Sequence, residues 1–162
     1  MAHAVAARPT GATLYTPEQF ERRQQSVWTL VQGILAPLQF LVFLVSLVLV
    51  LRYVITGDGY GVATVSIVIK TGFLYTIMVT GAIWEKVVFG QYLFAPAFFW
   101  EDVFSFVVIA LHSAYIAMLW QGVWAPDTLM AVALAAYAAY VVNAGQFLWK
   151  LRQARLDRER HA

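Results

Sequence analysis

Ionisable side chains gather in one short stretch of an otherwise apolar chain. Residues 84–115 contain three carboxylates, a lysine and a histidine: Glu85, Lys86, Glu101, Asp102 and His112. Only 12% of the 162 residues are charged, whereas 61% are hydrophobic. An ionisable group in an apolar environment is costly unless it is paired or has a function. We therefore expect this stretch to carry chemistry or ion handling.

The adjacent carboxylates Glu101 and Asp102 are the first candidates for catalysis. They are flanked by aromatic residues, namely Phe98, Phe99, Trp100 and Phe104. A carboxyl group among aromatic rings loses solvation, and a neighbouring carboxylate further disfavours its charged form. Such a group can hold a proton at neutral pH and donate it to a substrate. The alternative is a set of interfacial charges with Lys86 as their partner.

Two further ionisable residues are expected near the middle of the membrane. Counted from Trp84 and Trp100, Lys70 and His112 lie at similar depth. His112 also shares a helix face with Glu101 but lies roughly 16 Å away along the axis, so that only a large flat ligand could contact both. Alternatively, His112 only forms a hydrogen bond between helices, and Lys70 extends its amine towards the outer surface.

Uncharged polar residues form stripes on two predicted helices. One stripe is Gln32, Gln39 and Ser46, and the other is Tyr140, Asn143 and Gln146. Spacings of seven and three residues return to nearly the same helix face, so both stripes should face protein rather than lipid. They could contact a ligand or only hydrogen-bond between helices.

Four apolar runs are long enough to cross about 30 Å of hydrocarbon at roughly 1.5 Å per residue. They cover residues 30–51, 62–83, 103–119 and 129–148. Together with a mean hydropathy of +0.68, they predict an all-α, integral membrane four-helix bundle. Gly122 and Pro126 make the last connection short, so the last two helices should form an antiparallel hairpin. The six tryptophans fall near predicted helix ends, as in an aromatic belt.

One domain is expected, with residues 1–15 as a mobile tail, 16–150 as the transmembrane domain and 151–162 as a charged cytoplasmic tail. Thr16, Pro17 and Gln19 have the spacing of a helix-capping box, and no signal peptide is apparent. Apart from Lys70 and Arg52, the basic residues fall on the side of the two termini. This bias predicts that both termini are cytoplasmic. Because the formal net charge is only +2, we expect no nucleic-acid partner.

Several blocks of the chain, together covering about residues 14–156, resemble the 3-vinyl bacteriochlorophyllide hydratase family, also named 2-vinyl bacteriochlorophyllide hydratase. They include IWEKVVFGQYLFAPAFFWEDVFS, LHSAY and AAYAAYVVNAGQFLWKLRQARL. The resemblance implies an enzyme of bacteriochlorophyll synthesis in the inner, intracytoplasmic membrane of purple phototrophic bacteria. It would hydrate the C3 vinyl group of chlorophyllide a or 3-vinyl bacteriochlorophyllide a to 1-hydroxyethyl. No dissociable cofactor is expected, because the magnesium belongs to the substrate.

Hydration of a vinyl group calls for a general acid and then a base. We expect Glu101 or Asp102 to be the acid. The other carboxylate, or Glu85, would stabilise positive charge and orient water. His112 could ligate the substrate magnesium or position water, and the residues do not decide between these roles.

The propionate of such a substrate needs a cation, which could be Lys70, Lys86 or Arg52. Lys86 is the best placed if the substrate enters from the cytoplasm. Amide side chains could hydrogen-bond ring carbonyls, and aromatic rings could stack on the macrocycle. These remaining candidates are Gln39, Trp100, Tyr115 and Asn143.

Three other functions remain open at this point. A pigment carrier or assembly factor would use the same histidine and aromatic residues and leave the pigment unchanged. A proton or ion carrier would use Lys70, His112 and Glu101, although no inverted repeat is apparent. A structural subunit would leave the carboxylates without a role. The small-residue helix faces also permit a homo-oligomer.

Overall fold

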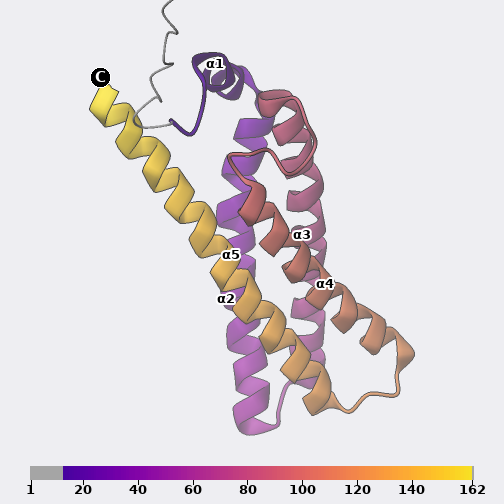
Figure 1. The fold of residues 1–162 in the computed structure, drawn as a ribbon. Coiled ribbons are helices and arrows are strands. Elements are labelled where there is room, and N and C mark those ends of the chain that lie inside the picture. Colours follow the sequence, from indigo (N-terminus) through magenta and orange to yellow (C-terminus); the bar gives the residue numbers. More distant parts are fainter. Residues whose placement is uncertain (1–12, 162) are drawn as a thin grey trace, which may run out of the picture.

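The structure is a computed structural model that describes residues 13–161. It contains five helices: α1 (Pro17–Gln25), α2 (Val27–Thr56), α3 (Tyr60–Phe89), α4 (Phe99–Gln121) and α5 (Pro126–His161) (Figure 1). No strand occurs in the part of the chain that the structure describes. Four of the helices are long and apolar enough to cross a membrane, which confirms the predicted all-α membrane bundle.

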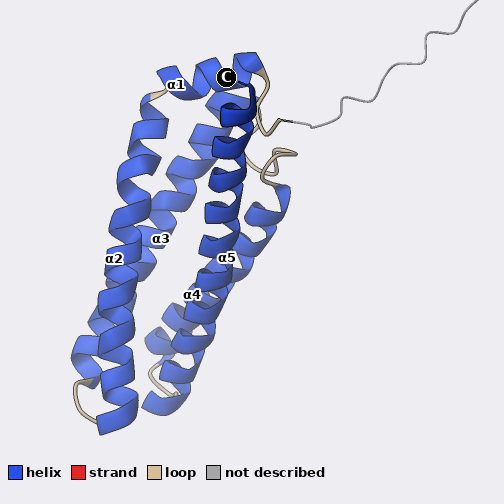
Figure 2. Cartoon of the chain, turned by 90° about the vertical axis from the view of Figure 1, so that its left-hand side faces the viewer, coloured by secondary structure: helices blue, strands red, loops and turns tan. Residues whose placement is uncertain are grey.

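The capping box predicted from Thr16 and Gln19 is confirmed. The amide of Gln19 donates to Thr16 Oγ1 at 3.2 Å, and the amide of Thr16 donates to Gln19 Oε1 at 2.9 Å. Ser26 then ends α1 and caps α2, because its hydroxyl accepts from the amide of Trp28 at 3.2 Å. The chain turns at Ser26, and α1 lies across one end of the bundle (Figure 2).

The four long helices extend beyond the apolar runs at both ends. Glycines, rather than the last apolar residue, end three of them: Gly57, Gly90 and Gly122 have φ angles of 77°, 87° and 67°. This left-handed conformation is the usual helix C-cap and is strained for residues with a side chain. Residues 1–12 of the predicted 1–15 tail lie outside the described residues, whereas Tyr15, within the same predicted tail, stacks on Phe89.

The long helices form two antiparallel hairpins, α2 with α3 and α4 with α5, which pack against each other (Figure 1). The predicted hairpin of the last two helices is therefore confirmed. We call the end that carries α1, the α3–α4 connection and residue 161 the α1 end. The opposite end, with the α2–α3 and α4–α5 connections, is the far end.

The bundle is apolar outside and partly polar inside. Large aliphatic side chains such as Val48 and Ile55 are exposed on its surface, as expected for a lipid-facing helix. The interior buries ten polar or charged residues: Gln39, Ser46, Lys70, Thr71, Glu85, Glu101, Asp102, Ser105, His112 and Asn143. The predicted inward orientation of Gln39, Ser46 and Asn143 is therefore correct.

Candidate active site

The buried ionisable residues form two groups. The carboxyl cluster consists of Glu85, Glu101 and Asp102 and lies near the α1 end. The amine centre consists of Lys70 and His112 and lies deeper in the bundle. On α4, ten residues separate Asp102 from His112, which corresponds to roughly 15 Å of helix.

The α3–α4 connection brings the carboxyl cluster together. Glu85 lies near the end of α3, and Glu101 and Asp102 lie in the first turn of α4. Their exposed fractions are only 5%, 4% and 3%. The structure thus places all three predicted acidic residues in one buried region.

Glu85 and Asp102 form a carboxyl pair, because both are buried at the α3–α4 connection and each accepts from one of two consecutive backbone amides. Ala95 N donates to Glu85 Oε2 at 3.3 Å, and Phe94 N donates to Asp102 Oδ2 at 2.7 Å. No lysine or arginine of the described residues lies within ion-pair distance of either carboxyl group. Two buried carboxylates in contact repel each other, so this arrangement favours a single proton shared between them.

The connection that supplies these two amides has a strained backbone at Phe94. Its φ angle is 60°, which is unusual for a residue with a bulky side chain. The ring packs at 5.7 Å from the ring of Phe99 and stacks at 5.5 Å on the ring of Phe106. In this left-handed conformation the amide of Phe94 donates to Asp102, a feature for which the sequence carries no signal.

Glu101 pairs with Lys150 and not with Lys86, the partner in the alternative considered from the sequence. Lys150 Nζ lies 3.8 Å from Glu101 Oε1 and also donates to the carbonyl of Ala97 at 2.8 Å. The second carboxyl oxygen of Glu101 is buried and has no hydrogen-bond partner. A signal for Lys150 does exist in the sequence, because it continues the stripe of Asn143 and Gln146 by four residues.

The alternative considered from the sequence, in which Lys86 pairs with the carboxylates, is wrong. Lys86 is exposed, donates to the carbonyl of Gly90 at 2.8 Å, and lies 5.4 Å from the centre of the Tyr92 ring. Consecutive helical residues point about 100° apart. When Glu85 faces the interior, the amine of Lys86 is therefore turned towards the surface.

The amine centre is a direct contact between α3 and α4. Lys70 Nζ lies 3.1 Å from His112 Nε2, and neither residue is exposed. The prediction of similar depth is confirmed, and the alternative in which Lys70 extends to the outer surface is wrong. His112 Nδ1 donates to the carbonyl of Val108 at 2.8 Å, so Nε2 accepts a hydrogen bond from the amine of Lys70.

Aromatic rings surround the amine of Lys70. Its Nζ atom lies 4.0 Å from the centre of the Tyr140 ring, 5.1 Å from that of Tyr137 and 5.7 Å from that of Phe43. Tyr137 also stacks on His112, with 5.8 Å between the ring centres. Within residues 13–161, no carboxylate lies within ion-pair distance of Lys70.

A polar layer lies between the two groups. Asn143 Nδ2 donates to Ser105 Oγ at 2.9 Å, and that hydroxyl donates to the carbonyl of Glu101 at 2.8 Å. Gln39 Oε1 and Asn143 Oδ1 are buried without a hydrogen-bond partner. Because the amide nitrogen of Asn143 is already engaged, its free oxygen is the atom left for a ligand donor.

The remaining predicted residues lie away from these contacts. Trp100 is 65% exposed, so its ring faces outwards although its neighbours Glu101 and Asp102 are buried. Tyr115 is fully buried three residues beyond His112 on α4, and its hydroxyl has no partner. Arg52 is exposed in the last turns of α2, at the far end.

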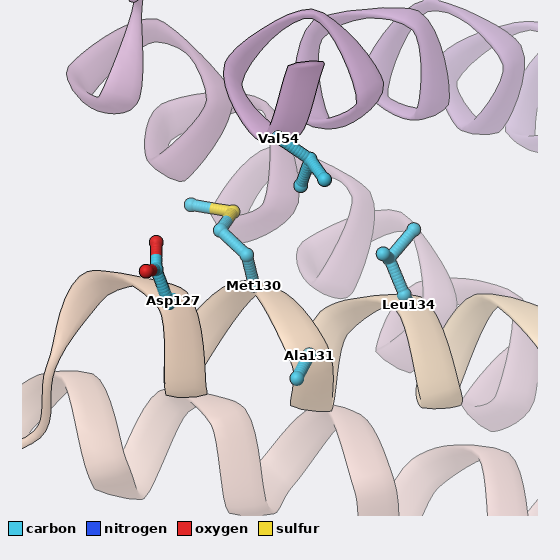
Figure 3. A pocket seen from close by; sticks show the side chains of 5 residues that line it. All are labelled: Val54, Asp127, Met130, Ala131 and Leu134. Carbon is cyan, nitrogen blue, oxygen red and sulfur yellow. The ribbon is translucent and has the colours of Figure 1, made fainter. Parts of the chain in front are cut away.

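A pocket of about 260 Å³ lies between α2 and α5 at the far end, remote from the carboxyl cluster (Figure 3). Its lining consists of Val54, Asp127, Met130, Ala131 and Leu134. Only one of these side chains is ionisable, and Asp127 Oδ1 accepts a weak hydrogen bond from the hydroxyl of Tyr53 at 3.4 Å. The pocket therefore lacks the paired groups that acid–base chemistry requires.

Comparison with known proteins identifies the family of this chain. A model of the family described as 2-vinyl bacteriochlorophyllide hydratase matches residues 15–153. A protein of that name from Cereibacter sphaeroides is 74% identical over 147 residues, which cover 90% of this chain and 91% of the relative. One from Rhodobacter capsulatus is 71% identical over 150 residues, which cover 92% of this chain and 86% of the relative. No solved structure matches. The chain belongs to the 2-vinyl bacteriochlorophyllide hydratase family.

Proposed function

We propose that this protein is a hydro-lyase of bacteriochlorophyll synthesis that adds water to the vinyl group of a chlorin or bacteriochlorin. The substrates would be chlorophyllide a and 3-vinyl bacteriochlorophyllide a, and the products their 3-(1-hydroxyethyl) derivatives. The ring carbon that carries the vinyl group is C2 in the older numbering of the macrocycle and C3 in the newer one. Family membership supports the reaction, and the buried carboxyl pair is the observation that carries its mechanism.

The reaction is a hydration without redox change. The π electrons of the vinyl group take a proton at its terminal carbon, and the positive charge left on the ring-attached carbon is spread over the macrocycle. Water attacks that carbon, and the resulting oxonium loses a proton to a base. The enzyme must therefore supply one proton and take one back.

The Glu85–Asp102 pair is suited to both proton transfers. While the pair holds its shared proton, one carboxyl group can act as the acid. Once the proton has gone to the vinyl carbon, the two carboxylates repel each other, so the pair readily takes the proton of the attacking water. The amides of Phe94 and Ala95 hold both groups in place.

Glu101 is suited to a different role. It forms an ion pair with Lys150 instead of a carboxyl pair. An ionised carboxylate beside the vinyl group would stabilise the developing cation, and its free oxygen could orient water. Between the two acids considered from the sequence, we therefore favour Asp102.

His112 cannot ligate the magnesium of a substrate whose vinyl group lies at the carboxyl cluster. In a chlorin, the vinyl group and the magnesium are separated by little more than the radius of the macrocycle. Glu101 and His112 are about three helical turns apart on α4. Since Lys70 already occupies His112 Nε2, we assign the carboxyl cluster to the vinyl group and no magnesium ligation to His112. The magnesium belongs to the substrate, and the mechanism requires no other cofactor.

Location follows from the distribution of charge. The α1 end carries both described chain ends and the α3–α4 connection, and most basic residues lie there. By the positive-inside rule, we assign this end to the cytoplasmic side of the inner membrane. The carboxyl cluster would then act near the cytoplasmic leaflet.

Expression in a host that lacks the pathway tests the reaction. Membranes would be supplied with chlorophyllide a, and the pigment analysed by chromatography and mass spectrometry. We expect a product heavier by one water, which is lost in the double variant Glu85→Gln/Asp102→Asn. Pigment that binds but stays unchanged, with 3-vinyl bacteriochlorophyllide a also refused, would instead support a carrier.

A further inference from the structure

We propose that Lys70 binds the propionate carboxylate of the substrate, so that the macrocycle lies along the bundle with its vinyl group at the carboxyl cluster. This inference rests on the proposed function. It identifies which cation receives the substrate and in which direction the substrate lies.

Lys70 has the features of an anion receptor, because its charge is not matched by any carboxylate of residues 13–161. Its amine is fully buried, and its contacts are His112 Nε2 and the faces of aromatic rings. These groups stabilise an ammonium only in part, because none of them carries a negative charge. A buried charge without a counter-charge is costly, and a ligand carboxylate would supply it.

The other cations named from the sequence are less suitable. Lys86 is exposed and donates to Gly90, and Arg52 is exposed at the far end. Lys150 is already engaged by Glu101 and by the carbonyl of Ala97. Lys70 is thus the buried amine that can take up a carboxylate without losing an existing ion pair.

Electrostatics also decides the direction of the substrate. A propionate placed at the α1 end would meet Glu85, Glu101 and Asp102, and like charges repel. A vinyl group placed there meets the proton donor that it needs. The opposite direction would put the vinyl group beside Lys70 and His112, far from the carboxyl cluster.

The dimensions of the two groups fit one substrate. Ten residues on α4 separate Asp102 from His112, or roughly 15 Å before side-chain reach is counted. The vinyl and propionate substituents stand on adjacent pyrrole rings and both extend outwards from the rim, and the side chains of Asp102 and Lys70 reach towards them from the two groups. The layer of Ser105, Gln39 and Asn143 would then face the ring between them.

His112 is a positioning residue in this arrangement. Its Nδ1 proton is fixed by the carbonyl of Val108, so Nε2 holds one N–H of Lys70. An ammonium has three N–H donors, and two remain for a carboxylate. Removal of the imidazole should therefore weaken carboxylate binding without abolishing it.

The test compares the free acid of the pigment with its methyl ester, since only the acid carries the charge. Purified full-length protein in detergent is titrated with chlorophyllide a or the ester, and binding is followed by quenching of tryptophan fluorescence. We expect the acid to bind roughly tenfold or more tightly than the ester. Lys70→Met should remove this preference by weakening only the acid, whereas the matched control Lys86→Met should keep it.

A second measurement uses the unaltered protein, in case Lys70→Met fails to fold. The propionate is converted to its N-hydroxysuccinimide ester, whose carbonyl is attacked by a nearby lysine amine with loss of N-hydroxysuccinimide. Peptide mapping should place the new amide at Lys70. Attachment at Lys86 or Lys150, or equal affinities for acid and ester, would overturn the proposal.

These outcomes are separable from the failure of the proposed reaction. If pigment is bound with a Lys70-dependent preference for the acid but is never hydrated, the result contradicts the hydratase mechanism and supports the carboxylate site at Lys70. If hydration proceeds equally with acid and ester, the result supports the reaction and contradicts the binding of the propionate by Lys70.

Discussion

The carboxyl cluster and the amine centre are both buried groups of ionisable residues, but they are built differently. The carboxyl cluster lies at a helix connection, where free backbone amides of Phe94 and Ala95 can reach Asp102 and Glu85. The amine centre lies in the middle of two helices, whose amides are already used, so Lys70 contacts only side chains. A connection suits proton transfer, because its backbone can stabilise charge as it moves. A site between helices suits the binding of a ligand that brings its own charge.

This comparison predicts the largest loss of activity at the carboxyl pair. Asp102→Asn should lower kcat by roughly 10²–10⁴-fold, because the pair loses the proton that it transfers. Pigment binding should change little. Steady-state assays in membranes would measure kcat, with Asp58→Asn in the exposed α2–α3 connection as the control. Normal turnover of the Asp102→Asn enzyme would show that another residue is the general acid.

A variant of the amine centre should change KM rather than kcat. Lys70→Met should raise KM roughly tenfold or more for the free acid and leave kcat within a few-fold, because the lost contact is remote from the reacting carbon. The same assay with a range of substrate concentrations separates the two parameters. A fall in kcat as deep as that of Asp102→Asn would break the proposed division of roles.

Lys150→Met should affect stability as well as turnover. Loss of this ion pair leaves Glu101 buried without its cation, and we expect the free energy of unfolding to fall by about 1.5–3 kcal/mol. Lys150→Arg should restore most of it. Thermal unfolding in detergent, followed by circular dichroism, would measure the change. Equal stability of the Met and Arg variants would show that the pair does not hold Glu101.

Phe94 permits a sharper test of the connection. A β-branched residue is strained at a φ of 60°, whereas glycine adopts it freely. Phe94→Val should therefore cost about 1–3 kcal/mol of stability and reduce kcat. Phe94→Gly should keep more activity, although it loses the whole ring. If valine is tolerated better than glycine, an apolar side chain at this position matters more than the left-handed backbone conformation.

The smallest effect is expected at Lys86. Its amine contacts only Gly90 and the Tyr92 ring at the surface. Lys86→Met should change kcat and KM by less than roughly twofold, because a single exposed contact contributes little. If Lys86→Met removed the preference for the free acid over its methyl ester, the substrate carboxylate would bind at the α1 end instead.

The residues of the site were largely identifiable from the sequence, whereas their pairings were not. Glu85, Asp102, Lys70 and His112 stand out because charge is rare among apolar residues. Their contacts depend on helix rotation and on which helices meet. Forty-two residues separate Lys70 from His112 along the chain.

The sequence by itself determined the membrane-spanning helices. Long apolar segments in lipid must satisfy their backbone groups internally, and left-handed glycines end those helices. Only the tertiary structure decided that Lys150 rather than Lys86 neutralises Glu101, that Phe94 donates to Asp102, and that Lys70 meets a neutral histidine nitrogen instead of an acid. Each of these contacts joins residues from different elements. Contacts within the α4–α5 hairpin, at the α3–α4 connection and between the two hairpins therefore set the chemistry that the apolar pattern left open.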